Sequence, residues 1–442
     1  MLLIGNGNLI TRDPKTPFLE NGCVAVKDNK IVGVELTSHL KAKYPRATFV
    51  DARGGVIMPG LINTHMHFYS SFARGMDLKD QSPQEFNDIL TRLWWRLDKV
   101  LTLEDVYYSA AVALIGCIQN GTTTVFDHHA STGCVSGSLF KLADACRDLG
   151  LRTCLSYEVS DRDGEQVARQ GIEENTEYIR DCQKTEDSMR RGLFGLHASF
   201  TLNDGLLRRS AERAAELGAG CHIHTAEALS DVTDCQKRYN KRVVERLDDF
   251  GVLRPDSIAA HCVHVAGREM DILRQKQPLV VHNPESNMGN AVGCAPVLEL
   301  MEKGVRVGMG TDGYTCDMLE SLKVANLLHK HQQQNAAAGW VEPHTMLFEQ
   351  NAGFASACFG ETLGKLVPGS LADVIVLDYD PPTPMDADNI SGHVLFGLSG
   401  RSVVTTVVNG KVLMQDRRIL ITDKVEIASR ARELAREVWR RF

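Results

Sequence analysis

The chain has 442 residues, of which 43% are hydrophobic and 24% charged, and its 49 basic and 56 acidic side chains give a formal net charge of −7. This balance excludes a protein that coats nucleic-acid phosphates and a protein with a polybasic membrane surface. The longest strongly apolar run, residues 110–118, is half the length that a bilayer requires. No signal peptide is visible in the first residues, so we expect a cytoplasmic protein.

Twelve cysteines are irregularly spaced, and none belongs to a C-x-x-C pair. Without an export signal, this pattern favours free thiols in a reducing cytosol over disulfides. The spacing does not support a zinc site built from thiolates.

Short β-rich runs occur at both ends of the chain. They cover residues 2–4, 22–26, 30–34 and 48–50 at one end and 373–377, 403–408 and 411–413 at the other. Asn409-Gly410 predicts a hairpin between the last two runs. We expect residues 1–58 and 365–423 to form one discontinuous β-sandwich domain, and the helical period of the apolar residues in 424–442 predicts a C-terminal helix.

Between residues 59 and 364, short apolar runs alternate with helical stretches such as 205–217 and 236–250. The candidate strands are eight: 61–64, 122–126, 152–157, 193–196, 220–223, 257–260, 279–281 and 305–310. Alternation of this kind predicts the α/β class, and eight strands with crossovers in about 300 residues suggest a (β/α)8 TIM-like barrel.

Ten of the fifteen histidines fall at or just past the ends of these strands. They are His65, His67, His128, His129, His197, His222, His224, His261, His264 and His282, and Asp312 follows the eighth strand. Active sites of barrels are built at this edge. So many imidazoles on one rim are hard to explain as core packing, because each buried nitrogen needs a partner.

The pair His65 and His67 lies at a strand end, where side chains two positions apart face the same way. Neutral imidazole is a good zinc ligand, although an H-x-H pair alone is a weak signal. Glu227 follows His224 by three residues and offers a nearby proton carrier. Each residue also has an ordinary alternative: His261 as a hydrogen-bonded core residue, Asp312 as a helix N-cap and Glu227 as a solvated side chain.

Six segments in order, 59–67, 222–227, 260–264, 281–288, 310–313 and 371–378, are similar to motifs of the amidohydrolase superfamily. Within it, the chain resembles the branch of cytosine and guanine deaminases and triazine hydrolases, over essentially its whole length. Segments 93–98, 127–131 and 387–393 resemble more closely the SsnA aminohydrolases of selenium-metabolism gene neighbourhoods. The substrate of that subgroup is poorly defined.

The resemblance implies a role for each matching residue. His65, His67 and His224 would be metal ligands, and Asp312 would be a ligand that also takes a proton from the nucleophilic water. Glu227 would carry a proton to the substrate and His261 would orient the water. A metal lowers the pKa of bound water to about 7, so hydroxide is supplied at neutral pH. The resemblance also implies a homo-oligomer, a dimer or larger.

The metal count is expected to be one. Binuclear members of the superfamily use a carboxylated lysine after the fourth strand, whereas this strand ends in Leu196-His197-Ala198-Ser199. Zinc is the expected metal, with iron as the alternative. His197 is then a candidate substrate contact or a structural imidazole.

Further candidates for the substrate pocket are His128, His129, Arg74, Trp94, Trp95 and Asn287. The two tryptophans fit equally well as a cover for a flat heterocycle or as packing between a lid helix and the barrel. The leading hypothesis is hydrolytic deamination of an amino-substituted nitrogen heterocycle, such as a purine, pterin or pyrimidine. The alternatives are hydrolysis of another leaving group (chloride or alkylamine), opening of a cyclic amide, and a non-catalytic accessory role in a selenium pathway.

Overall fold

The computed structural model describes residues 1–185 and 187–442. Its centre consists of two sheets in which all neighbouring strands are parallel. The first sheet contains β6 (Leu61–Met66), β7 (Thr122–His129), β8 (Arg152–Tyr157) and β9 (Arg190–Gly192). The second contains β10 (Phe194–Ala198), β11 (Cys221–Thr225), β12 (Ile258–His261), β13 (Leu279–His282) and β14 (Val307–Met309). Every residue of β6, β7, β8 and β10 to β14 is buried, as expected for parallel strands covered by helices.

The two parallel sheets meet at both of their outer edges. Isolated parallel bridges join Val159 to Leu196 at one seam and Met66 to Asp312 at the other. In the part of the chain that the structure describes, continuous pairing does not close all these strands into one ring. The parallel α/β arrangement agrees with the prediction, whereas a fully paired barrel is not seen.

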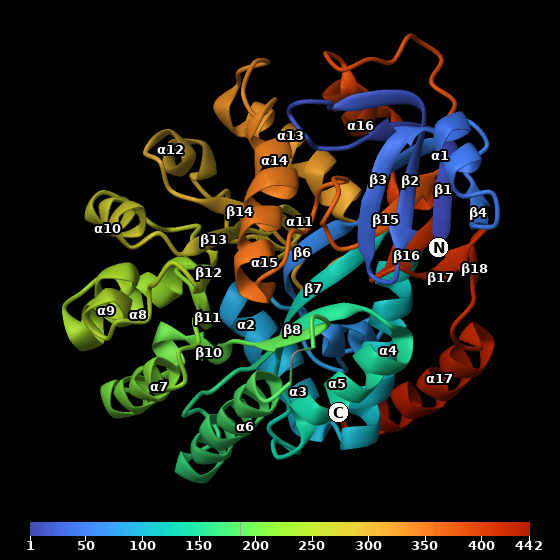
Figure 1. Ribbon diagram of the computed structural model, residues 1–442. Coiled ribbons are helices and arrows are strands. Elements are labelled where there is room, and N and C mark those ends of the chain that lie inside the picture. The colour runs from blue at the N-terminus through green and yellow to red at the C-terminus, as the bar shows by residue number, and fades with distance from the viewer. Residues whose placement is uncertain (186) are drawn as a thin grey trace.

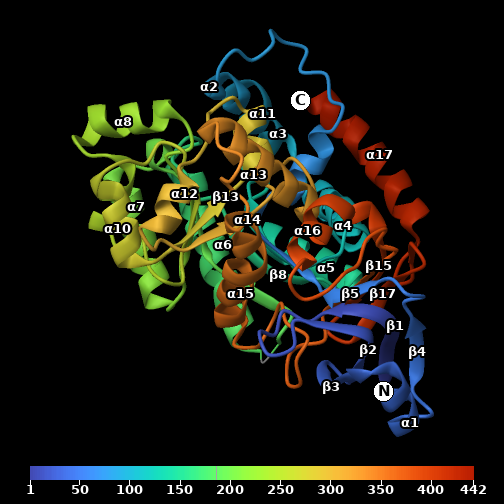
Figure 2. The same ribbon diagram turned by 90° about the horizontal axis from the view of Figure 1, so that it is seen from above.

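Helices connect and cover these strands (Figures 1 and 2). They are α4 (Leu103–Gln119), α5 (Ser138–Leu149), α6 (Glu165–Gln183), α7 (Asp204–Glu216), α8 (Leu229–Tyr239), α9 (Val243–Asp249), α10 (Arg268–Lys276), α11 (Pro284–Gly289), α12 (Val297–Glu302), α13 (Met318–Gln333), α14 (Glu342–Thr345) and α15 (Asn351–Phe359). The single helix predicted over 236–250 is wrong. Asn240 adopts a left-handed φ of 54°, which ends α8, and α9 begins only at Val243.

An insertion after β6 contributes the wall of the candidate site. It contains the short helical turns Phe68–Ala73, α2 (Phe86–Ile89), Leu90–Trp94 and α3 (Trp95–Val100).

No single helix in the described ranges is long and apolar enough to cross a membrane. One pair of helical segments, Phe86–Val100 and Leu103–Gln119, has the length and composition of a membrane span only when the two are taken together, and they are bent by 114° relative to each other.

Strands from both ends of the chain form one mixed sheet of nine strands. They are β1 (Leu2–Ile10), β2 (Phe18–Lys27), β3 (Lys30–Leu36), β4 (Thr48–Asp51), β5 (Val56–Pro59), β15 (Val374–Leu377), β16 (Val403–Val408), β17 (Lys411–Gln415) and β18 (Arg418–Ile419). The antiparallel pairing of β5 with β15 joins the two ends, so blue and red strands lie side by side in Figure 1. Strands from the two ends thus share one sheet, but a sandwich of two separate sheets is not confirmed. Three shorter elements, α1 (Thr37–Lys43), α16 (Ile390–Gly397) and the turn Gly400–Ser402, complete this part of the chain.

Two features tie the terminal segments to the parallel sheets. Arg152 of β8 forms a fully buried ion pair with Asp373, which also accepts a hydrogen bond from the Asn409 amide at 2.8 Å. Helix α17 (Lys424–Arg441) packs on α4. The indole of Trp439 donates to the Phe72 carbonyl at 2.7 Å. All twelve cysteines are free thiols in the described residues.

Candidate metal centre and active site

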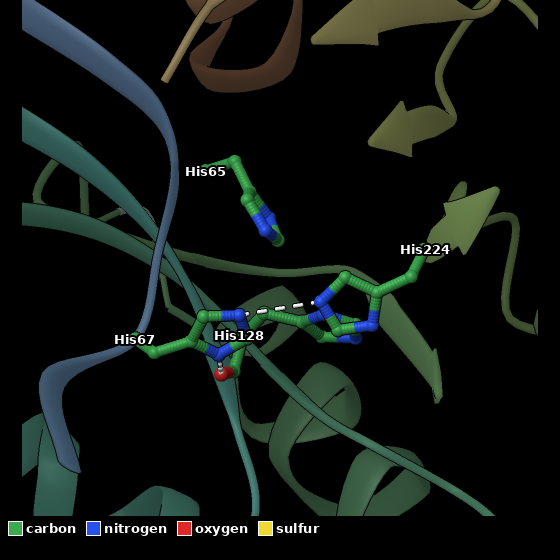
Figure 3. Close-up of side chains that lie close together, drawn as sticks. All are labelled: His65, His67, His128 and His224. Carbon is green, nitrogen blue, oxygen red and sulfur yellow. Dashed lines mark hydrogen bonds between the residues drawn. The ribbon is translucent and has the colours of Figure 1, made fainter. Parts of the chain in front are cut away.

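Four side chains from distant parts of the chain converge at the carboxyl ends of the parallel strands. His65 and His67 come from the end of β6, His224 from β11 and Asp312 from the segment after β14. The Oδ1 atom of Asp312 lies 3.1 Å from Nε2 of His67 and 3.8 Å from Nε2 of His65. Nε2 of His224 lies 3.2 Å from Nε2 of His67. Figure 3 shows the three imidazoles directed toward one another.

Hydrogen bonds at the opposite ring nitrogens orient these imidazoles. The Nδ1 atom of His224 contacts the His197 carbonyl at 3.0 Å, and Nδ1 of His67 contacts the carbonyl of His128. Nδ1 of His65 lies 2.8 Å from Nε2 of His222. A carbonyl can only accept, so Nδ1 of His67 and of His224 carries a proton, and Nε2 of each ring holds a lone pair when that ring is neutral. Metal-binding histidines in proteins are commonly oriented in this way.

The arrangement fits a divalent metal ion. Ligands on a tetrahedral zinc with bonds of 2.0–2.1 Å are about 3.3 Å apart, close to the spacing of the Nε2 and Oδ1 atoms here. Nε2 of His65 is buried and has no hydrogen-bond partner in residues 1–185 and 187–442. Three imidazoles with one carboxylate form a donor set that suits zinc, and iron is compatible with it.

The pKa values of the three histidines also indicate that the space between their rings favours a positive charge. Burial lowers the pKa of His67, but its hydrogen bond to Asp312 and the charges of Asp312, Glu158 and Asp127 outweigh burial and raise this pKa to about 9. Burial holds the pKa of His65 and of His224 well below the usual histidine value. These two rings are therefore neutral, which is the form that binds metals.

Three groups of ligand atoms lie close enough together to hold a metal, and each shares residues with the cluster described above. They are His65, His67, His128 and His224; His65, His261 and Asp312; and Glu158, His197 and His224. His128 was expected to contact substrate, but its ring stacks on His222 at a centroid distance of 4.3 Å and lies in the ligand cluster.

Glu227 and His261 stand beside the metal-ligand cluster. Nε2 of His261 lies 3.6 Å from Glu227 Oε2 and 3.9 Å from Asp312 Oδ2, and its Nδ1 is 2.8 Å from Asn287 Oδ1. Asn290 donates to Glu227 at 3.3 Å. Burial raises the pKa of Glu227 to about 6, which leaves this carboxyl able both to give and to take a proton near neutral pH.

The main chain is strained where the strands end at the site. His261 and Asp312 have φ values of 72° and 54°, in the left-handed region that non-glycine residues rarely adopt. Such a conformation costs about 1–3 kcal/mol and occurs mainly at functional sites. Gly310 is required by close packing, because a Cβ there would lie 2.5 Å from Asn283 Oδ1 and 2.8 Å from the His65 carbonyl oxygen.

A pocket opens above the cluster and includes His67, His224, Glu227 and Asp312 in its lining. Of the predicted substrate residues, Trp94, Trp95 and His197 line it. His128, His129 and Asn287 are buried behind the lining, and Arg74 is exposed outside it. Asn287 contacts His261, and His129 contacts the hydroxyl of Ser131 at 3.0 Å.

Sequence reasoning missed Glu158, Asp98 and Phe200, which also line the pocket. Glu158 directly follows β8, the third predicted strand, and its place at a strand end was the signal that could have identified it. Burial raises its pKa to about 7. Asp98 forms an ion pair with Arg162, whose guanidinium lies 5.1 Å from the Trp95 ring centre.

The amidohydrolase family pattern matches residues 56–413. The 5'-deoxyadenosine deaminase of Methanosarcina mazei is 32% identical over 441 residues, covering 99% of this chain and 98% of that protein. The 5-methylthioadenosine/S-adenosylhomocysteine deaminase of Pelotomaculum thermopropionicum is 31% identical over 438 residues, covering 98% of each. The crystal structure of an adenosine deaminase from Xanthomonas campestris with bound zinc has a TM-score of 0.88 and 24% identity, and covers 100% of this chain and 99% of that one.

These similarities, together with the geometry above, define the class of protein. The chain belongs to the amidohydrolase family, whose fold is of the TIM-barrel type. It is accordingly a hydrolase that acts on carbon–nitrogen bonds.

Proposed function

We propose that this protein is a metal-dependent deaminase that releases ammonia from an amino-substituted purine, most readily one carried on a nucleoside-like scaffold. The observation that carries the proposal is the convergence of three imidazole nitrogens and a carboxylate beside Glu227, a buried carboxyl whose pKa is raised to about 6. Two relatives more than 30% identical are named as deaminases of adenosine derivatives, which supports a purine as the ring.

His65, His67, His224 and Asp312 would hold one divalent metal. The donor set suits zinc, and the metal would supply a nucleophilic water at neutral pH. Asp312 accepts a proton from that water. Glu227 would give its proton to the ring nitrogen and then take up the remaining water proton from the added hydroxyl. That proton would pass to the amine, which leaves as ammonia, and the proton held by Asp312 would return Glu227 to its acid form. His261, oriented through Asn287, positions the water and stabilises negative charge that develops on the attacked carbon's oxygen.

The pocket supports a flat ligand. The rings of Trp95 and Phe200 lie 6.4 Å apart between centroids and the Trp95 ring lies 6.2 Å from that of His197. Aromatic side chains of this kind contact the faces of a heterocycle, while His197 offers a ring nitrogen to its edge. We include in this proposal the resemblance of residues 93–98, 127–131 and 387–393 to the SsnA aminohydrolases.

The test is ammonia release from a panel of purines, purine nucleosides, pterins and pyrimidines by protein of measured metal content. The proposal predicts turnover of at least one aminopurine. Release of chloride or alkylamine from a substituted ring, without ammonia from any purine, would identify the alternative hydrolase activity instead.

The proposal extends to the organisation of the chain: a metal-dependent domain over 59–364, a β domain from 1–58 and 365–423, and a terminal helix over 424–442. We also propose that the protein is cytoplasmic and forms a homo-oligomer. Free thiols suit a reducing compartment. The exposed side chains of Trp340, Val341 and Phe396 offer an apolar patch for self-association. Light scattering on purified protein tests the oligomer.

A further inference from the structure

Glu158 faces the pocket from a place that the reaction does not use. Its amide donates to the His129 carbonyl at 2.8 Å, which fixes the residue at the end of β8. The residue is 6% exposed and lines the pocket together with His197 and Trp95. A carboxylate in this position is desolvated and requires compensating contacts.

Those contacts are incomplete in the described residues. Oε1 of Glu158 lies 3.4 Å from His67 Nδ1 and 3.7 Å from His128 Nδ1, and Oε2 lies 3.8 Å from His197 Nε2. Each distance exceeds the 2.7–3.2 Å of a normal hydrogen bond. Within residues 1–185 and 187–442, Oε1 has no hydrogen-bond partner. Buried polar atoms are nearly always paired, so the protein satisfies the carboxyl group of Glu158 only in part, and this group at the pocket lining can take a partner that a ligand brings.

Asp98 shows the contrast within the same pocket. Its carboxylate is held by an ion pair with Arg162 and by the hydroxyl of Thr132 at 3.3 Å. Asp98 is therefore neutralised by the protein itself, whereas Glu158 keeps an oxygen available.

The position of Glu158 separates it from the reacting end of the pocket. The His67 ring presents Nε2 to Asp312 at 3.1 Å and Nδ1 to Glu158 at 3.4 Å, so the two carboxylates lie at different edges of this ring. Glu227 lies on the Asp312 side, linked to it through His261. A flat substrate with its amino carbon near Glu227 can therefore extend another part toward Glu158.

We infer that Glu158 is a specificity-determining residue that accepts a hydrogen bond from an N–H or O–H donor on the substrate, away from the carbon that is hydrolysed. The inference rests on the proposed function and narrows it to aminopurines that carry such a donor. The donor is either a sugar hydroxyl of a nucleoside or a ring N–H of a free base. A site built around such a bond discriminates against analogues that lack the donor.

The experiment compares kcat/KM of the parent, Glu158→Ala and Glu158→Gln on three substrates. These are 5'-deoxyadenosine, its 2',3'-dideoxy analogue, and adenine, which has no sugar but carries a ring N–H in its place. Metal content is measured for each variant. Glu174→Gln is the matched control, because Glu174 is a buried carboxylate bound to the Gly137 and Leu139 amides outside the pocket.

We expect Glu158→Ala to lower kcat/KM by about 10- to 100-fold for a substrate that carries the donor, as for other hydrogen bonds to charged groups. For a substrate without the donor, kcat/KM of the variant should stay within about 3-fold of the parent value. Selective loss on 5'-deoxyadenosine assigns the donor to the sugar, and selective loss on adenine assigns it to the ring. Glu158→Gln keeps an acceptor and should fall between the parent and Glu158→Ala.

A uniform loss on all three substrates, or no loss on any, would overturn the role of Glu158 while the parent's turnover still supports the deaminase. A metal-loaded parent that releases no ammonia from these purines or from any other aminopurine of the panel would overturn the proposed function, and this inference with it.

Discussion

The Nε2 atoms of His67 and His224 lie 3.2 Å apart, while both Nδ1 atoms are bound to main-chain carbonyls. When both rings are neutral these two nitrogens are both acceptors and repel each other, and in the absence of a metal a proton on His67, whose pKa is raised to about 9, relieves the repulsion. A cation between them removes the conflict, and Asp312 at 3.1 Å from His67 adds the negative charge that balances it. The pair is thus arranged for a shared metal ion.

The first prediction concerns metal content. The purified protein should hold close to one equivalent of divalent metal per chain, and His65→Ala and Asp312→Ala should lose both metal and turnover because each removes one ligand. Elemental analysis by mass spectrometry measures this directly. Two tightly bound ions per chain would contradict a single site and direct attention to the group of Glu158, His197 and His224.

The second prediction concerns proton transfer. Glu227→Gln preserves the shape of the side chain and its contact with Asn290, but the amide cannot transfer a proton. The variant should retain its metal and lose roughly 10²- to 10⁴-fold in kcat. Glu216→Gln, on the exposed end of α7, serves as the control and should match the parent. Near-parental turnover by Glu227→Gln would show that another group moves the proton.

The third prediction concerns the orientation of His261. Asn287 Oδ1 lies 2.8 Å from Nδ1 of His261 and so directs Nε2 toward Glu227 and Asp312. Asn287→Ala should lower kcat by about 10- to 100-fold with little change in KM. Asn287→Asp retains an acceptor and should recover part of the rate. An equal loss in both variants would argue that Asn287 only supports packing.

The fourth prediction separates substrate contact from structure at His197. This ring lines the pocket, and its Nδ1 contacts the Thr201 hydroxyl at 2.6 Å. His197→Ala should change the ratio of kcat/KM between two substrates by about 3- to 10-fold and leave metal content intact. His393→Ala removes a buried histidine outside the pocket, bound to the Tyr379 hydroxyl, and should leave that ratio unchanged. Metal loss in His197→Ala would place His197 among the ligands.

The fifth prediction concerns the link between the terminal sheet and β8. Asp373→Ala would leave the guanidinium of Arg152 buried without its partner. The free energy of unfolding should fall by about 3–5 kcal/mol in urea titrations at fixed metal concentration. Glu165→Ala breaks an exposed pair with Arg209 and should cost less than about 1 kcal/mol. A similarly small effect of Asp373→Ala would mean that the pair does not join the two parts.

Much of the site was predictable because its ligands lie at the ends of strands with a clear apolar pattern. His65, His67, His224 and Asp312 each follow such a run, and parallel strands bring their carboxyl ends to one edge. The convergence that the sequence predicted is what the structure contains. Their roles as metal ligands are still to be tested.

Other features could not be predicted, for physical reasons. The carbonyls that orient His67 and His224 belong to the main chain and have no residue-type signature. Asn287 lies on the short helix α11, and its contact with His261 joins residues 26 positions apart in the chain. The break after α8 depends on the left-handed conformation of Asn240. Asparagine adopts this conformation in some places and not in others, so the residue type alone does not predict the break.

The most direct measurement of the central claim is the ratio of ammonia released to 5'-deoxyadenosine consumed by the zinc-loaded protein, with Glu227→Gln assayed beside it. The account predicts one ammonia for each nucleoside converted by the parent and a large loss of rate in Glu227→Gln at equal metal content. A zinc-loaded parent that leaves this and other aminopurines intact, while it displaces chloride or alkylamine from another ring, would contradict it.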